Sequence, residues 1–245
     1  NNISEIVITG VNIGDYGRVS NNSLYDLLQK INELNLINRF RISSIEPNLL
    51  TKKIIELISN SNSFLPHFHI PLQSGNDKIL SLMKRKYNTA IYKNKIGLIK
   101  EIIPDACIGA DVIVGFPNES DDDFDVTYKF IEKLKINYLH VFSYSNRNET
   151  MASKMKNQVS KKIKTQRSQS LQKLSNKIRF TFYKNNIGKI RKVLFESMFD
   201  DDCLIGFTDN YIRVFVKGNK NMINKIFNVK LLFIAESDKM FGEIV

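Results

Sequence analysis

The sequence has 245 residues, of which 42% are hydrophobic and 25% are charged, and its formal net charge is +11. This composition is ordinary for a globular protein, and no apolar run approaches the ~20 residues that a membrane-spanning helix needs. The two cysteines, Cys107 and Cys203, are too few for a disulfide framework or a multi-cysteine metal site. No secretion signal opens the sequence, so we expect a cytoplasmic protein. We further expect a monomer that does not contact membranes.

The first 150 residues alternate between strand-like and helix-like segments. Strands are expected at 6–9, 40–45, 67–72, 108–114 and 138–142. Helices are expected at 24–34, 51–58, 79–83, 92–99 and 121–134. This alternation predicts an α/β fold with parallel strands, and five such units indicate a partial βα barrel of the TIM type. Because the chain opens at Asn1 almost directly into a strand, we expect it to be a fragment of a longer protein.

Positive charge is concentrated in the next segment. Residues 1–150 carry 17 basic and 17 acidic side chains, whereas residues 151–192 carry 13 basic side chains and no acidic one. An apolar stripe recurs at helical spacing through this segment, at Val159, Ile163, Leu171, Leu174, Ile178 and Phe182. We therefore predict a basic connecting helix within 151–186 that packs on one face and meets a polyanion with the other.

The last segment, 187–245, has the pattern of a small β domain. Short strand candidates lie at 190–195, 204–208, 211–216, 229–234 and 242–245, with polar turns between them. Regular short strands predict a small antiparallel β barrel, an architecture that often binds oligonucleotides. The predicted domains are therefore 1–150, 151–186 and 187–245.

Polar clusters follow four of the five predicted parallel strands, at the carboxyl ends where the active sites of βα barrels lie. These clusters span 9–17, 43–47, 73–75 and 115–119. In the third strand, His67 and His69 point to the same face, as two ligands of a zinc hydrolase would, although only His140 remains as a further histidine. A packed or hydrogen-bonded histidine pair is the more frequent interpretation. The two cysteines are best interpreted as small buried residues.

Taken in order, these motifs resemble one family, the radical-SAM methylthiotransferases that modify tRNA. The matching stretches are 5–17 (EIVITGVNIGDYG), 41–50 (RISSIEPNLL), 66–87 (starting PHFHIPLQSGNDKILSL), 105–119 (DACIGADVIVGFPNE) and 138–144 (YLHVFSY). The segment 188–245 resembles the RNA-binding TRAM barrel that closes these enzymes. Within the first two motifs, residues 10–17 and 41–47 are most similar to the branch of the family that acts on N6-threonylcarbamoyladenosine beside the anticodon.

The resemblance implies a chemistry that rests on cofactors. A four-iron, four-sulfur cluster, held by a Cys-x-x-x-Cys-x-x-Cys loop, cleaves S-adenosylmethionine to a radical that abstracts hydrogen from C2 of adenine. A second such cluster, held by three further cysteines, supplies sulfur. The implied partners are the tRNA anticodon stem-loop and an electron donor. Neither cysteine set is present in this sequence, so we expect the chain alone to be inactive and assign it no catalytic or metal-binding residue.

The resemblance also assigns binding roles by position. S-adenosylmethionine contacts are implied for Asn12, Ser44, Glu46, Gln73, Ile113, Val114, Gly115 and Phe142. From charge and position we predict RNA contacts at Lys161, Lys162, Lys164, Arg167, Tyr211, Arg213 and Lys217. Asn118 stands where the family usually has glycine, and asparagine tolerates the left-handed backbone such a turn needs. Two alternatives stay open: a non-catalytic RNA-binding relic, and a zinc hydrolase using His67 and His69.

Overall fold

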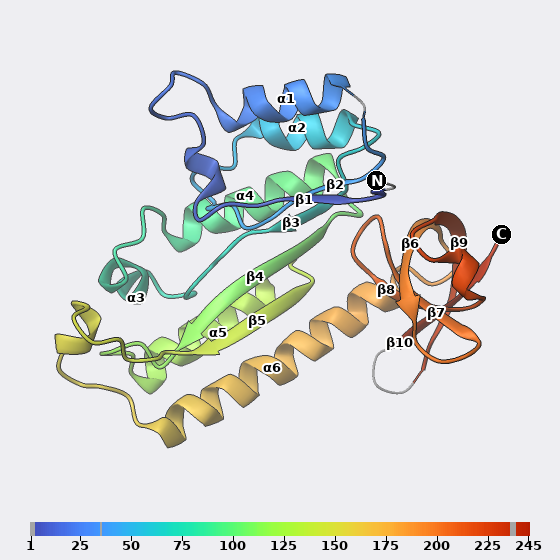
Figure 1. Ribbon diagram of the computed structural model, residues 1–245. Helices are drawn as coiled ribbons and strands as arrows, with labels where there is room; N and C mark the ends of the chain where they lie inside the picture. The colour runs from blue at the N-terminus through green and yellow to red at the C-terminus, as the bar shows by residue number, and fades with distance from the viewer. Residues whose placement is uncertain (1–2, 35, 236–238) are drawn as a thin grey trace.

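The computed structural model describes residues 3–34, 36–235 and 239–245. Its first half contains five parallel strands in chain order (Figure 1). They are β1 (Ile6–Ile8), β2 (Phe40–Ile42), β3 (His67–His69), β4 (Cys107–Val114) and β5 (Tyr138–Ser143). β1 pairs with β2, and β3, β4 and β5 pair in sequence. A hydrogen bond from the Ile45 amide to the His69 carbonyl, 3.0 Å long, joins the two sheets. The expected α/β class with parallel strands is confirmed.

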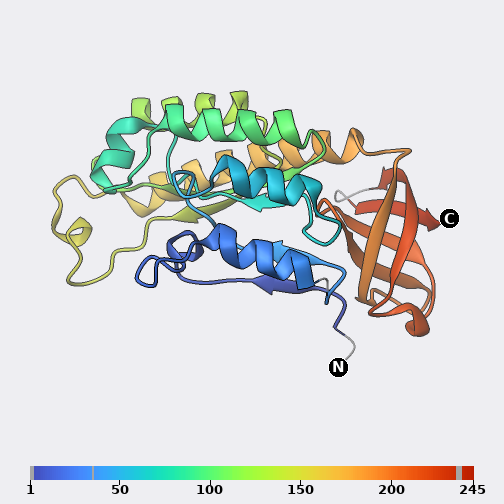
Figure 2. The same cartoon turned by 90° about the horizontal axis from the view of Figure 1, so that it is seen from above.

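Helices cover one face of these strands. They are α1 (Leu24–Leu34), α2 (Lys52–Asn60), α3 (Asp77–Leu82), α4 (Thr89–Ile102) and α5 (Asp121–Lys133), with a short 3-10 turn η1 (Ile13–Asp15) after β1. Side-chain caps fix several starts, and Ser120 and Asp123 form a complete capping box at α5. The core beneath them contains fully buried Tyr92, Ile55 and Val112. Figure 2 shows α1, α2, α4 and α5 as a layer over the strands.

The predicted strands at 40–45 and 67–72 are longer than the observed ones. Beyond His69 the chain stays extended but leaves the regular ladder, with amides of Ile70 and Leu72 donating to the carbonyls of Gly109 and Asp111. At Gln73 the backbone turns left-handed, with φ of 66°. Alternation of side chains could not reveal this departure, because it depends on where the neighbouring strand lies.

The connecting helix is shorter than predicted. α6 (Lys161–Lys184) begins after Ser160, whose side chain accepts a hydrogen bond from the Ile163 amide. Val159 lies outside it, and the preceding residues form a loop with a 3-10 turn, η2 (Ala152–Lys154). α6 packs against β5 and runs from the far end of the parallel strands to the C-terminal domain (Figure 1). In the part of the chain that the structure describes, no helix is long and apolar enough to cross a membrane.

The C-terminal domain is a closed five-stranded barrel. Its strands are β6 (Ile190–Met198), β7 (Cys203–Thr208), β8 (Arg213–Lys217), β9 (Ile226–Ala235) and β10 (Lys239–Ile244), with a 3-10 turn η3 (Lys220–Met222) after β8. The prediction of a wholly antiparallel barrel is wrong at one seam, because β8 and β10 pair in parallel to close it. Tyr211 lies before β8 rather than in it, with a φ of 66°.

Two buried arginines join the barrel to the parallel strands. Arg39 and Arg41 share the carboxylate of Glu5, through Nε to oxygen distances of 2.7 and 2.8 Å. Their remaining nitrogens donate to four backbone carbonyls of the barrel, those of Lys192, Phe207, Thr208 and Asp209. A charged group this deeply buried is stable only when paired and hydrogen-bonded, so these contacts fix the barrel at the amino ends of the strands.

Candidate functional site

The carboxyl ends of the parallel strands carry the side chains that the sequence singles out. After β1, the exposed Asn12 donates from Nδ2 to a carboxylate oxygen of Asp15, 2.6 Å away. After β2, Ser44 and Glu46 are half-buried. Because parallel strands end at one edge, these groups gather on one side of the molecule, opposite the C-terminal barrel (Figure 1). We call Asn12, Ser44, Glu46, Gln73, Ile113 and Phe142 the strand-end site.

Glu46 is held by a residue that the sequence reasoning missed. Nη1 of Arg85, in the turn after α3, lies 3.2 Å from the Glu46 carboxylate, and both side chains are partly exposed. Nε of Arg85 is buried and has no hydrogen-bond partner among the described residues. The pair orients a carboxylate at the strand ends and leaves guanidinium donor capacity beside it. Nothing in the spacing of the sequence places Arg85 near Glu46, because the two lie 39 positions apart.

Gln73 is the least satisfied side chain of the strand-end site. It is buried, and its backbone is tied to β4 by hydrogen bonds to the Asp111 carbonyl and from the Ile113 amide. Its Oε1 has no hydrogen-bond partner within the described part of the chain. A buried acceptor without a partner costs free energy, and it is found where a ligand or water completes the bond. Gln73 therefore fits a site for a ligand with hydrogen-bond donors.

The β4 and β5 strands supply the apolar part of the strand-end site. Ile113 and Phe142 are paired neighbours on the inner face, and Phe142 is 53% exposed. Val114, however, alternates to the opposite face and is fully buried in the core beneath the helices. Its side chain is therefore not available to a ligand. Gly115 adopts φ of 71°, and a Cβ there would collide with the side chain of Lys164.

Two predicted RNA contacts are used inside the protein instead. Arg167 is 5% exposed, and its guanidinium lies 2.6 Å from the buried Glu119 carboxylate and 2.7 Å from Asp121. Lys164 donates to the Tyr144 carbonyl at 3.0 Å and lies over the ring of that residue. Both side chains anchor the start of α6 to the ends of β4 and β5. The prediction of Arg167 as an RNA contact is wrong because its packing against these segments buries it.

The other predicted RNA contacts differ in whether their side chains are exposed. Lys161 and Lys162 are exposed on α6, and Arg213 and Lys217 are exposed on β8. Tyr211 instead faces the parallel strands, where its ring stacks on that of His67 with centroids 4.0 Å apart. Tyr211 is therefore part of the contact between the two domains and not of an outer barrel surface.

The two histidines of β3 are both hydrogen-bonded. Nε2 of His67 lies 2.9 Å from the hydroxyl of Tyr138, and Nε2 of His69 lies 2.9 Å from a carboxylate oxygen of Asp111. Burial holds the pKa of His67 well below its ordinary value, so its ring is neutral at physiological pH. Among the described residues, no group of three or more histidine, cysteine or acidic side chains is placed to hold a metal ion.

Neither cysteine fits a cluster ligand. Cys107 is buried at the start of β4, where burial raises the pKa of its thiol to about 12. Cys203 is partly buried at the start of β7, and burial raises its pKa as well. A cluster ligand must be a thiolate in a multi-cysteine loop, so these thiols are structural.

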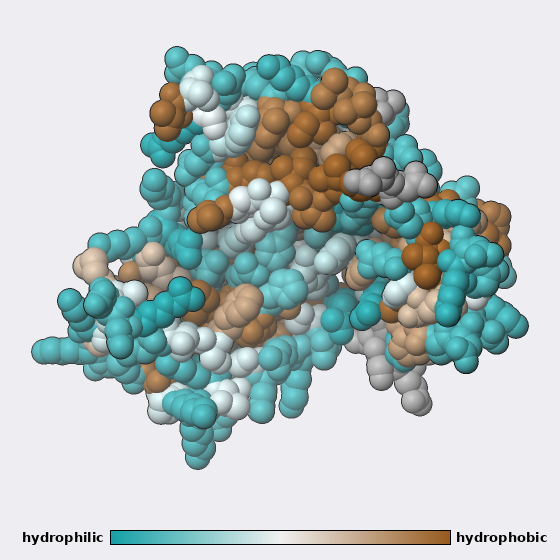
Figure 3. Space-filling model, viewed as in Figure 1, coloured by the Kyte–Doolittle hydropathy of each residue, from teal (hydrophilic) through white to brown (hydrophobic). Residues whose placement is uncertain are grey.

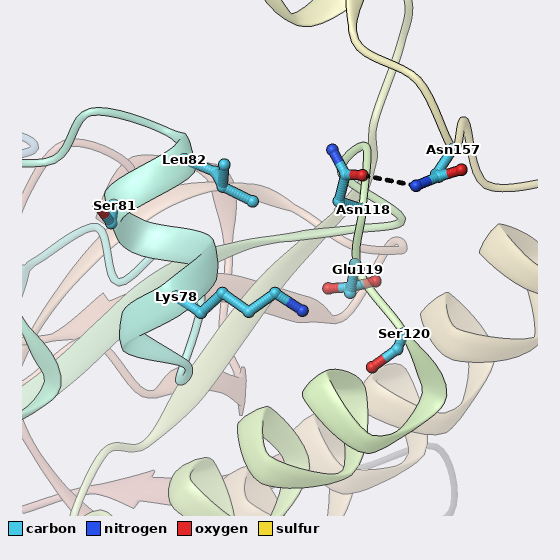
Figure 4. A pocket seen from close by; sticks show the side chains of 7 residues that line it. All are labelled: Lys78, Ser81, Leu82, Asn118, Glu119, Ser120 and Asn157. Carbon is cyan, nitrogen blue, oxygen red and sulfur yellow. Dashed lines mark hydrogen bonds between the residues drawn. The ribbon is translucent and has the colours of Figure 1, made fainter.

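An open depression lies beside the strand-end site, between α3 and the turn after β4 (Figure 4). Its volume is about 720 Å³, and its lining includes Lys78 and Leu82 of the α3 segment. Asn118 has a left-handed backbone, with φ of 68°, and accepts a hydrogen bond from Nδ2 of Asn157 at 2.9 Å. The turn expected from the sequence is thus present, and asparagine replaces glycine there without distortion.

The fold and the strand-end motifs define the class of protein. Residues 1–131, more than half of the chain, match the Radical SAM superfamily, and the chain belongs to it. Its curated relatives include the threonylcarbamoyladenosine tRNA methylthiotransferase MtaB of Bacillus subtilis, 36% identical over 236 residues, which cover 93% of this chain and 52% of that protein. The tRNA-2-methylthio-N(6)-dimethylallyladenosine synthase of the same bacterium is 36% identical over 245 residues, covering 98% and 48%.

The chain therefore spans about half the length of the curated relatives it matches. Among solved structures, the coproporphyrinogen III oxidase HemN of Escherichia coli superposes with a TM-score of 0.59 at 14% identity, covering 93% of this chain and 54% of that one. At this identity the likeness concerns the fold alone. The radical SAM assignment predicted from the motifs is confirmed.

Proposed function

We propose that this chain is the S-adenosylmethionine-binding and RNA-binding part of a tRNA methylthiotransferase. The observation that carries the proposal is the unpartnered, buried Oε1 of Gln73, within the described chain, at the strand ends of a radical SAM fold. The amino group of a methionyl moiety would supply the missing donor. Glu46, held by Arg85, and Ser44 would take the ribose hydroxyls, Asn12 the methionyl group, and Ile113 and Phe142 would pack against the adenine.

The proposed substrate is N6-threonylcarbamoyladenosine beside the tRNA anticodon. Relatives from the threonylcarbamoyl and the dimethylallyl branches are equally identical to this chain, at 36%. The choice between the branches therefore rests on the motifs at 10–17 and 41–47. Comparing the methylthiolation of the two modified adenosines by a full-length enzyme that contains this chain would test it directly.

The cofactor chemistry needs groups that this sequence does not supply. In radical SAM enzymes a bound iron–sulfur cluster supplies the electron that cleaves S-adenosylmethionine. The residues of the strand-end site would hold the S-adenosylmethionine. The only cysteines, Cys107 and Cys203, are not cluster ligands, so we expect the chain alone to be inactive and the full reaction to require two clusters and an electron donor. Iron content and methylthiolation after anaerobic reconstitution test this; a chain that binds two clusters and turns over would contradict it.

Binding of S-adenosylmethionine is the first test of the proposal. Equilibrium dialysis should detect binding by the chain, and Glu46→Gln should weaken it because a neutral amide cannot accept from ribose hydroxyls as strongly. The matched control is Glu56→Gln on α2, an exposed carboxylate that lies 3.5 Å from Lys52. Equal affinities for the two variants would contradict the assignment of Glu46. An affinity for tRNA without any for S-adenosylmethionine would favour the RNA-binding relic.

The proposed RNA surface is the outward face of α6. Lys162, Lys173, Lys177 and Lys184 recur at helical spacing there, and all four are exposed. The helix contains no acidic residue, so phosphates would meet no repulsion from its own side chains along the ~33 Å between the first and last of these lysines. Its apolar face is already packed on β5 and cannot also enter a membrane. Charge complementarity therefore favours an RNA backbone as the partner.

A salt titration of tRNA binding tests this surface. Replacing the four α6 lysines with glutamine should lower the salt slope of the logarithm of affinity by up to about 3.6, or about 0.9 for each phosphate contact. The matched control replaces four exposed lysines elsewhere, at Lys30, Lys86, Lys93 and Lys129, with the same change in net charge. Equal slopes for the two quadruple variants would show that α6 does not contact RNA.

A further inference from the structure

A cavity separate from the strand-end site lies beneath the C-terminal half of α6, at the amino ends of β4 and β5. Its volume is about 560 Å³, and its walls come from residues within 100–105, 132–137 and 174–189. These segments are the end of α4 and the turn before β4, the end of α5 and the turn before β5, and the part of α6 that leads to the barrel (Figure 1). Its described lining shares no residue with the strand-end site. We call it the α6 cavity.

The floor of the α6 cavity is apolar because the apolar stripe of α6 is longer than the surface it packs on. Leu171 and Leu174 are buried, at 0% and 3% exposure, whereas Ile178 further along the stripe is half-buried and lines the cavity. Phe182 and Ile136 also line the floor, and both are buried. The volume is within the range of small-ligand sites, which are mostly apolar with a few polar groups. The cavity thus offers a surface that the apolar body of a ligand can cover.

Lys100 brings a positive charge to this cavity without an acidic partner. The side chain is half-buried, and its ammonium donates to the carbonyl of Ala106 and to the side-chain oxygen of Asn137, both neutral groups. It also lies 5.8 Å from the ring centre of Phe182. A charge removed from water is usually matched by an opposite charge, but no carboxylate of the described residues forms an ion pair with Lys100. An anion in the cavity would be that partner.

Two further lysines at the rim of the α6 cavity are also unpaired. The ammonium groups of Lys135 and Lys177 have no ion-pair or hydrogen-bond partner in the part of the chain that the structure describes, and both side chains are exposed. Of the two acidic residues in the lining, Asp105 already forms ion pairs with two basic side chains, whereas Glu132 has no such partner among the described residues. Lys100, Lys135 and Lys177 therefore face one unpaired carboxylate, which favours a negatively charged ligand.

We propose that the α6 cavity binds a small organic anion with an apolar or aromatic body. The body covers Ile178 and Phe182, and the anionic group meets Lys100 and Lys135 at the rim. An inorganic anion would leave the apolar floor exposed to water, and a neutral apolar molecule would leave the charge of Lys100 unmatched. Because the cavity shares no residue with the strand-end site, this binding is independent of the proposed function. Lys177 also belongs to the α6 row proposed for RNA, so Lys135 is the lysine that distinguishes the cavity from that surface.

The test compares three probes by isothermal titration: naphthyl phosphate, which has both an aromatic body and an anionic group, naphthol, and inorganic phosphate. We expect the chain to bind naphthyl phosphate about tenfold more tightly than either of the others, because only this probe uses both parts of the cavity. Naphthol is needed because Figure 3 shows another apolar area, over β1 and α1, where Val7 and Leu34 are 55% and 62% exposed. A saturating concentration of S-adenosylmethionine should not displace naphthyl phosphate.

Two pairs of variants place the binding in this cavity. Thr181 lines the cavity and is exposed, so Thr181→Trp should fill it and lower the affinity for naphthyl phosphate by about tenfold or more. Thr165→Trp is the matched control, because both threonines are exposed on α6 and each hydroxyl donates to the carbonyl four residues earlier. Lys135→Gln should lower the affinity about two- to fivefold, as expected for a charge partly screened by water, whereas Lys93→Gln, at an exposed position of α4, should not change it.

The outcomes separate this cavity from the strand-end site. Binding of naphthyl phosphate no tighter than that of naphthol or of phosphate overturns the proposal, as does its displacement by S-adenosylmethionine. Equal affinities of the two tryptophan variants, both shown by thermal unfolding to be folded, also overturn it. If Thr181→Trp does not fold, the comparison of Lys135→Gln with Lys93→Gln decides. In Glu46→Gln, an unchanged affinity for naphthyl phosphate beside a lowered affinity for S-adenosylmethionine supports two separate sites, and a parallel loss of both overturns the α6 cavity.

Discussion

The two ends of the parallel strands differ in how their polar groups are used. At the amino ends, Arg39 and Arg41 are buried and Glu5 is partly buried, and their charges are matched by each other and by four barrel carbonyls. At the carboxyl ends, Gln73 has a buried acceptor without a partner in the described chain, and the side chain of Glu46 is partly exposed. The arginine cluster at one end is an interface between domains, whereas the carboxyl ends leave the Gln73 acceptor for a ligand.

This difference shows that a buried charge does not by itself mark a functional site. The arginine cluster is more buried than the strand-end site and has stronger contacts, yet its geometry is that of an interdomain joint. The informative feature is an unsatisfied acceptor at the carboxyl ends of the strands, that of Gln73, since the unpartnered Nδ1 of His67 lies in the joint, where the ring is stacked on Tyr211. We expect changes at the amino ends to reduce stability, and changes at the carboxyl ends to reduce ligand binding instead.

The largest expected effect is at the interdomain joint. Arg41→Ala leaves the partly buried Glu5 carboxylate and two barrel carbonyls with fewer partners, and it should lower the free energy of unfolding by about 3–5 kcal/mol. Urea denaturation measures this change. Arg18→Ala is the control, because that side chain is 72% exposed and its contact with Asp15 is 3.8 Å long, so its loss should cost under ~0.5 kcal/mol. Similar losses of unfolding free energy in both variants would contradict the conclusion that Arg41 stabilises the contact between the domains.

The next effect is a pH dependence at the same end. Burial depresses the pKa of His67 below its ordinary 6.5, so the unfolded chain takes up a proton that the folded protein resists. Stability is therefore present above pH 6.5 and lost as the pH falls, by about 1.4 kcal/mol per unit. His67→Phe, which can still stack on Tyr211, should remove about 1.6 kcal/mol of the loss between about pH 6.5 and 5. Denaturation curves at both pH values, compared with those of the unaltered protein, decide the matter.

A smaller effect in free energy is expected at the open end. Gln73→Asn keeps a residue that tolerates φ of 66° but withdraws the amide by one methylene. The affinity for S-adenosylmethionine should fall about tenfold, which corresponds to ~1.4 kcal/mol, while the unfolding free energy changes by under ~1 kcal/mol. Isothermal titration and denaturation together measure both. A stability loss without a change in affinity would place Gln73 with the structural residues.

The smallest effect concerns the turn after β4. Asn118→Gly replaces one residue that tolerates a left-handed backbone with another, at the cost of the hydrogen bond to Asn157. We expect the unfolding free energy to change by under ~0.5 kcal/mol, whereas Asn118→Ala should cost about 1 kcal/mol because alanine resists φ of 68°. Thermal unfolding of the two variants compares them. A larger loss with glycine than with alanine would contradict this account.

The order and type of the elements follow from local patterns along the chain. Periodic apolar residues place the helices near 24–34, 92–99 and 121–134, because an amphipathic face must repeat wherever the helix packs. Strand-end motifs identify the radical SAM family, since close backbone turns and ligand contacts restrict residue choice locally. The concentration of basic residues in 151–192 likewise needed no structure.

Which of these residues are available to a ligand depends on the packing of distant segments. Arg167 and Lys162 are equally basic in the sequence, but only packing against Glu119 shows that Arg167 is internal. Tyr211 turns toward His67 because the barrel docks at the amino ends of the strands. Arg85 reaches Glu46 across 39 positions. Local patterns carry no information about such pairings, because the hydrophobic core, not the neighbouring sequence, sets the distances between segments far apart in the chain.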